Sequence, residues 1–185
     1  MIECMRRTAS EEEALKDVVK DVLGGHPGLM KMLEEKGYYT APASIEHHGA
    51  YRGGLLAHSI QVGYELMHLT SKLGLKWERK ESPMIIGLLH DVCKLDDYDC
   101  ISVGDNTSIE WKKDDALYPG HGEKSLIMLM GYIALTEEEK MCIRYHMGAF
   151  TDKKEWSYYT RAVKRYPNVL WTHTADMIAS QIKGV

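Results

Sequence analysis

The stretch GLLHDVCKLDD, residues 87–97, carries an imidazole, a carboxylate and an ammonium group into what otherwise reads as a buried helix. His90 and Asp91 follow the apolar run MIIGLL, residues 84–89, and Lys94 stands three residues after Asp91. A buried ionised carboxylate is costly unless it is paired or binds a metal. The stretch alone fits a helix cap or an ion pair between Asp91 and Lys94 as well as a metal site, so the decision rests on the rest of the chain.

The composition is that of an ordinary globular protein. The chain has 185 residues, of which 44% are hydrophobic and 27% charged, and this length fits a single domain, residues 1–185. The net charge of -4 disfavours membrane surfaces and long nucleic acids, which both attract cationic proteins. An N-terminus without a signal-peptide pattern and four scattered cysteines predict a cytoplasmic protein with reduced thiols.

Helical periodicity dominates the chain and predicts an all-α fold of about eight helices. The N-terminal helices occupy residues 1–49, and residues 50–182 form a core that includes the long helix GLLAHSIQVGYELMHLTSKLG. Ser82 and Pro83 are a cap and a first helical residue for SPMIIGLLHDVCKL. The pattern breaks at CISVGDNTSIEW, which predicts a small β-hairpin insertion near residues 99–112.

Other apolar helices also carry single polar residues inward. His58 lies on the apolar stripe of its helix, and Asp176 interrupts the final helix one turn after His173. A lone core histidine is usually only hydrogen-bonded, and each of these residues is ordinary by itself. Burying several such groups at separate places would cost free energy at each one. If they converge on one cation as its ligands, a single site explains them all.

Two further histidines extend the set. His121 opens the segment HGEKSL at a helix start, and His146 lies in CIRYHMG near a helix end. Taken alone, His146 is explained by a favourable interaction of an imidazole with the negative C-terminal end of a helix dipole. His121, taken alone, is explained as a loop residue before a helix cap.

With these residues together, the chain resembles the HD-domain superfamily of metal-dependent phosphohydrolases over about residues 50–180. The segment AYRGGLLAHS is similar to the family's first-histidine helix, LLHDVCK to its central motif, GHGEKS and RYHMG to its outer histidines, and THTADMIAS to its final-aspartate helix. The resemblance implies an orthogonal helical bundle around a metal site. The first part of the match is also similar to the HD half of bacterial 3′→5′ exoribonucleases.

The resemblance also implies the metal ligands. It assigns His58, His90, Asp91 and Asp176 to one ion. In relatives with two metals, Asp91 would bridge the ions, and the further ligands would be His121 and His146. Many such relatives have a second histidine where this chain has Met147, so both one and two ions remain open.

The mixed donor set suits Fe, Mn, Co, Ni or Zn without selecting one of them. Such ions acidify bound water and polarise a phosphoryl oxygen, and the developing charge then needs fixed cations. Lys94 is the first candidate for holding phosphate, although an ion pair with Asp97 or Asp91 also explains it. Arg52 and Lys124 are further candidates for substrate binding, and Asp91 and Lys94 are the candidate catalytic residues.

The sequence therefore predicts a phosphohydrolase that cleaves a phosphate ester of a small nucleotide-like substrate. The alternatives are a 3′→5′ exonuclease-type phosphodiesterase and a non-catalytic sensor that binds a metal or a nucleotide. The first alternative is disfavoured by the acidic balance, and the second by the complete set of implied ligands. His47 and His48 lie upstream of Arg52 and would line the entrance rather than bind metal.

Overall fold

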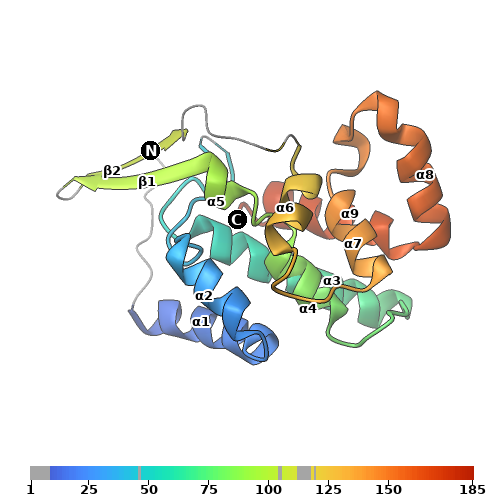
Figure 1. Ribbon diagram of the computed structural model, residues 1–185, viewed down its shortest axis with the longest axis horizontal. Helices are drawn as coiled ribbons and strands as arrows, with labels where there is room; N and C mark the ends of the chain where they lie inside the picture. Colours follow the sequence, from blue (N-terminus) through green and yellow to red (C-terminus); the bar gives the residue numbers. More distant parts are fainter. Residues whose placement is uncertain (1–8, 46, 104–105, 112–117, 119) are drawn as a thin grey trace.

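The computed structural model describes residues 9–45, 47–103, 106–111, 118 and 120–185, and these form an all-α bundle, as predicted (Figure 1). Apart from the single turn α5, the described part contains eight α-helices. The helices are α1 (Ala9–Leu23), α2 (Pro27–Glu35), α3 (Gly54–Leu73), α4 (Ser82–Leu89), α5 (Lys94–Asp97), α6 (Gly122–Leu129), α7 (Glu137–Arg144), α8 (Trp156–Arg165) and α9 (Asn168–Met177). Short helical turns η1 (Gly148–Phe150), η2 (Lys153–Glu155) and η3 (Ile178–Ile182) connect or extend them.

A β-hairpin follows α5 and projects away from the helices (Figure 1). Strand β1 (Tyr98–Val103) pairs with strand β2 (Asn106–Trp111) in antiparallel register, with Tyr98 opposite Trp111. The strands occupy the stretch in which the helical pattern of the sequence breaks. No helix among the described residues is long and apolar enough to cross a membrane.

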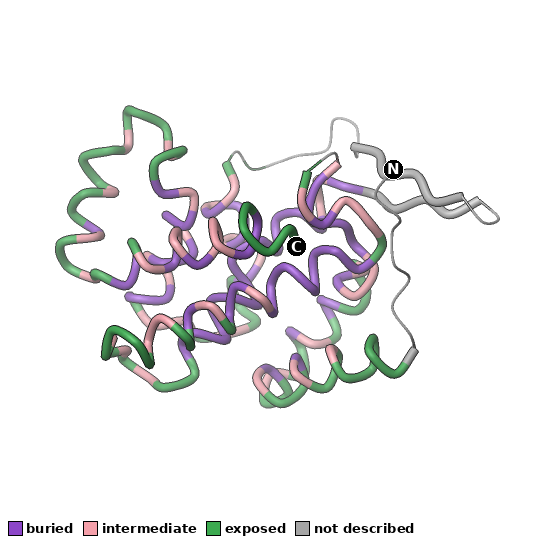
Figure 2. The backbone as a smooth tube through the Cα atoms, turned by 180° about the vertical axis from the view of Figure 1, so that it is seen from behind, coloured by how far each residue is buried: buried purple, intermediate pink, exposed green. Residues whose placement is uncertain are grey.

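Helices α3 and α4 form the centre of the bundle (Figure 2). Every residue of α4 is buried, which explains why its sequence shows no polar face. The two helices approach closely at Gly63 and Gly87, where a Cβ atom on Gly87 would overlap the backbone of Gly63. This contact fixes the end of α4 against α3, and therefore also fixes the position of His90 and Asp91, which follow α4.

We expect Gly87→Ala to destabilise the protein by about 1–3 kcal/mol, because the added methyl group must push two helix backbones apart. Urea denaturation of the two proteins measures the difference. Gly25→Ala is the matched control, since a Cβ atom at Gly25 meets nothing within 4 Å. Equal stability of Gly87→Ala and wild type would contradict the close packing of α3 on α4.

Two polar contacts anchor α4 to its surroundings. The hydroxyl of Tyr38 donates to the carbonyl of Leu88 at 2.7 Å, and the hydroxyl of Ser82 donates to Glu139 at 2.8 Å. Ser82 therefore does not cap its own helix, contrary to the sequence-based expectation, because its hydroxyl is used by α7. Glu139 also pairs with Arg79, so this buried carboxylate is fully compensated.

The chain end returns to the middle of the molecule (Figure 1). After α9, the π-helical turn η3 changes the helical phase immediately beyond Asp176, a feature that is frequent at functional sites. The backbone carbonyl of Val185 then lies 2.9 Å from Nδ1 of His58, so the last described residue contacts the polar cluster in the core.

Candidate metal centre

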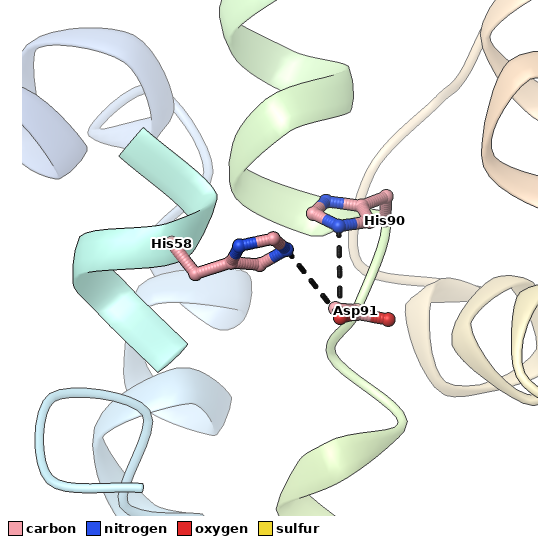
Figure 3. Close-up of side chains that lie close together, drawn as sticks. All are labelled: His58, His90 and Asp91. Carbon is pink, nitrogen blue, oxygen red and sulfur yellow. Dashed lines mark ion pairs between the residues drawn. The ribbon is translucent and has the colours of Figure 1, made fainter. Parts of the chain in front are cut away.

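The centre is built around Asp91, which lies one residue after the helix-capping His90 at the end of α4 (Figure 3). Oδ2 of Asp91 is 3.6 Å from Nε2 of His90 and 3.8 Å from Nε2 of His58, which projects from α3. His58 and His90 have no exposed surface, and Asp91 is 4% exposed. These three side chains form one compact group that could hold a metal ion.

His146 and Asp176 complete the cluster. Nε2 of His146, just after α7, lies 3.3 Å from Oδ1 of Asp91. Oδ1 of Asp176, on α9, lies 3.2 Å from Nε2 of His58. His90, His146 and Asp176 make a second overlapping group that could hold an ion, so helices distant in the sequence direct three imidazoles and two carboxylates at one point.

The other ring nitrogen of each histidine is held by the backbone. Nδ1 of His90 lies 2.9 Å from the carbonyl of Gly87, and Nδ1 of His146 lies 2.7 Å from that of Ile143. Nδ1 of His58 makes the contact with Val185 described above. A carbonyl oxygen only accepts hydrogen bonds, so each ring must carry its proton on Nδ1 when neutral, and the lone pair on Nε2 faces the cluster.

This arrangement leaves buried polar atoms without partners. In the described part of the chain, Nε2 of His58, His90 and His146 and Oδ1 of Asp91 are buried and make no hydrogen bond of acceptable geometry. Imidazole lone pairs directed at carboxylate oxygens repel one another unless a proton or a cation lies between them. The donor set and its orientation therefore fit a divalent transition metal.

The charges around Asp91 support the same conclusion. Burial alone would raise the pKa of Asp91, but the Lys94 ammonium and the His90 and His146 imidazoles bring this pKa well below its usual value. For His146, burial lowers the pKa, but contact with Asp91 raises it by more. A proton can therefore lie between Nε2 of His146 and Asp91 when no cation is bound. Asp91 is thus ionised and ready to bind a cation at neutral pH.

His90 and Asp176 respond to burial in different ways. Burial and the neighbouring His146 and His58 lower the pKa of His90 to about 4, so this ring is neutral and can act as a ligand. Burial raises the pKa of Asp176, but interaction with His58 and the other imidazoles outweighs it and lowers the value to about 2. Both groups hold the protonation state that metal binding requires.

The three cations predicted to bind phosphate lie in different settings. The ammonium of Lys94 is buried, 3.5 Å from Oδ2 of Asp91, and donates to the carbonyl of Ala43 at 2.6 Å. Lys124 is also buried, but its ammonium pairs with Asp97 at 2.7 Å. Arg52 is exposed in the loop before α3. Only Lys94 directly adjoins the cluster.

The two outer histidines are also separated. His146 belongs to the central cluster, whereas Nδ1 of His121 lies 3.4 Å from Sγ of Cys93, and His121 groups with Cys93 and Asp97. The His121 and His146 rings remain stacked, with centroids 6.3 Å apart. His173, which lies one turn before Asp176 on α9, has Nδ1 2.9 Å from the carbonyl of His146.

The structure places His48 at the edge of the cluster, whereas the sequence predicted it only at the entrance of the site. The ring of His48 lies 4.9 Å from that of His58, and its Nδ1 is buried without a hydrogen bond. Burial and the charges of His58 and Lys94 lower the pKa of His48 to about 4. Only the adjacent pair His47–His48 upstream of the His58 helix hints at this in the sequence, and His47 itself is exposed.

An open pocket of about 410 Å³ lies where Met147 follows His146 and where His121 precedes α6. Its size is in the usual range for small-molecule sites. The lining residues are Gly120, His121, Gly122, Glu123, Arg144, Met147, Phe150, Thr151, Asp152 and Glu155.

Comparison of the chain with family models, with curated proteins and with solved structures gave no match. The fold and the site therefore define the class by themselves: this is an all-α protein with a buried cluster of histidine and aspartate side chains that could hold a metal ion.

Proposed function

We propose that this protein is a metal-dependent phosphohydrolase that cleaves a phosphate ester of a small, nucleotide-like substrate. The observation that carries the proposal is the set of three buried Nε2 lone pairs directed at the ionised Asp91, with the ammonium of Lys94 fixed beside them. A cation bound there would supply an acidified water as nucleophile and would polarise a phosphoryl oxygen.

The chain's own residues would then have separate tasks. His58, His90, His146 and Asp176, with Asp91, would bind the ion, and the carbonyls at each Nδ1 keep the imidazoles in the required tautomer. His146 belongs to this set of ligands, whereas His121 groups with Cys93 and Asp97.

Lys94 is the residue that would bind the phosphoryl group. Burial lowers the pKa of Lys94, but Asp91 and other neighbours raise it by more, so the ammonium stays charged in a buried position. Asp91 and Ala43 hold this cation in place before substrate arrives, which is the arrangement that stabilises developing negative charge. The pocket lined by His121 and Met147 would hold the remainder of a small substrate.

The test is a metal and substrate screen on the purified chain. We expect the metal-free protein to take up Mn, Fe, Co, Ni or Zn and to release inorganic phosphate from phosphate monoesters, nucleoside monophosphates or cyclic nucleotides. Absence of metal uptake after reconstitution would overturn the proposal. Shortening of a single-stranded RNA oligonucleotide without monoester cleavage would favour the exonuclease alternative, and metal binding without any turnover would favour the sensor.

We expect Lys94→Gln to lower kcat/KM about 10- to 100-fold while the metal content stays unchanged, since a hydrogen bond to a charged group contributes about 1.5–3 kcal/mol. Steady-state kinetics with metal analysis of the same samples measure this. Lys140→Gln is the matched control, because Lys140 pairs with Glu137 on the exposed surface of α7. An equal or larger loss for Lys140→Gln than for Lys94→Gln would contradict the role of Lys94.

A further inference from the structure

A second group of metal-ligating side chains lies beside the central cluster. Cys93 precedes α5, Asp97 ends it, and His121 precedes α6. One donor atom from each residue lies within 4.8 Å of the others. From this geometry we infer a separate thiolate-containing site for Zn²⁺, formed by Cys93, Asp97 and His121 without Asp91 as a ligand.

The distances agree with a shared ion. Sγ of Cys93 is 3.4 Å from Nδ1 of His121. Two atoms bound to one tetrahedral zinc, with Zn–S of about 2.3 Å and Zn–N of about 2.05 Å, lie about 3.6 Å apart. The pair is therefore already at the separation that a tetrahedral ion requires. A carboxylate oxygen of Asp97 is the third donor, and a fourth position would be left to water.

The surroundings hold these ligands in place. The ammonium of Lys124 donates to Oδ1 of Asp97 at 2.7 Å, and a carboxylate can accept such a bond while it also binds a cation. The backbone N–H of Cys93 donates to the hydroxyl of Ser125 at 3.2 Å, which joins the turn before α5 to α6. The site is thus preorganised by contacts that do not depend on an ion.

The donors select the kind of metal. A thiolate with an imidazole favours Zn²⁺ or Co²⁺ over hard ions such as Mg²⁺ or Mn²⁺. Binding displaces the thiol proton of Cys93, which passes to solvent, so one proton is released for each ion bound at this thiol. The bound ion ties the turn that follows Asp91 to the start of α6.

Cobalt spectroscopy tests the inference without any activity assay. We expect Co²⁺ added to the metal-free full chain to produce a near-ultraviolet thiolate-to-cobalt charge-transfer band. Added Zn²⁺ should displace the Co²⁺ ion and abolish this band. Cys93→Ser should lose this band and retain the visible absorption of cobalt in the central cluster. Cys142→Ser is the matched control and should keep the band, because Cys142 is a buried thiol of α7 outside the group.

Two results would overturn the inference: a wild-type protein without the charge-transfer band, or a band that persists in Cys93→Ser. If Cys93→Ser does not fold, His121→Gln replaces it, and an unchanged band in that variant would contradict the shared ion. Asp91→Asn should retain the band while it loses the central metal, so this site and the phosphohydrolase proposal fail or succeed independently.

Discussion

Asp91→Asn should lower metal affinity and the proposed phosphohydrolase activity at least about a hundredfold. Substitutions of residues that only orient metal ligands already cost about 10- to 100-fold, and Asp91 contacts the ion-binding space directly. Its carboxylate lies within 3.3–3.8 Å of Nε2 of His58, His90 and His146, so it supplies the negative charge shared by all three imidazoles. An amide has the same shape but no charge.

The substitution should not unfold the metal-free protein. The amide nitrogen of asparagine is a donor, and the unpaired Nε2 atoms around it are acceptors. Circular dichroism and metal analysis of the purified variant separate loss of metal from loss of fold. Asp96→Asn is the matched control, since Asp96 pairs with the exposed Lys36 at 2.9 Å, outside the central cluster. Full metal content and activity in Asp91→Asn would refute the assignment of the centre.

The all-α fold was predictable because its signals are local. Thr136 followed by acidic residues predicts a helix start, and the structure has a capping box between Thr136 and Glu139. The continuous helix expected over SPMIIGLLHDVCKL is instead divided after Leu89, and α5 starts again at Lys94. The intervening turn directs His90 and Asp91 at the cluster, which is a demand of the site and not of local propensity.

The residue types of the site could be predicted from the sequence, but the way in which the side chains group in space could be predicted only in part. Single polar residues on apolar helices indicated convergence, and the structure does bring His58, His90, Asp91 and Asp176 together. Which outer histidine joins them depends on how α6 and α7 pack, and sequence spacing does not contain that information. The same applies to Cys93, whose meeting with His121 bridges 28 residues of sequence.

Backbone partners were beyond sequence reasoning altogether. The carbonyls of Gly87 and Ile143 select the tautomers of His90 and His146, yet any residue type supplies a carbonyl. The carbonyl of Ala43 likewise fixes Lys94. These contacts arise from the fold alone, and they convert a plausible list of ligands into an oriented donor set.

The metal-free protein should lose stability as the pH falls from about 6.5 to 4. The pKa of His90 is about 4 in the folded chain against 6.5 for a free imidazole, so in this window the unfolded chain binds a proton that the folded chain does not. A difference of about 2.5 units corresponds to about 3 kcal/mol lost by pH 4. His48, whose pKa is also lowered to about 4, acts in the same direction. The raised pKa of His146 adds stability only as the pH falls towards 6.5, and its contribution stays constant between pH 6.5 and 4.

A second loss follows at lower pH. The pKa of Asp176 is about 2 in the folded chain, below its ordinary 3.8, so the stability that its ionised form contributes is present above pH 4 and disappears as the pH falls towards 2. The pKa of Asp91, held well below its usual value, has the same sign. Acid should therefore weaken the metal-free protein in two steps, first through imidazoles and then through carboxylates.

Thermal unfolding of the chelator-treated protein between pH 7.5 and 4 measures the first step. In a protein of this size about 1 kcal/mol shifts Tm by about 2–4 °C, so His90 alone accounts for a fall of about 6–12 °C. His90→Gln should flatten the curve by that amount, because glutamine does not titrate, and His68→Gln on the exposed face of α3 is the matched control. Added Zn²⁺ should raise Tm most at neutral pH, since protons compete with the ion for Nε2. A wild-type Tm that stays level or rises on acidification to pH 4 would contradict the buried neutral state of His90, and with it the lone pair that the metal centre requires.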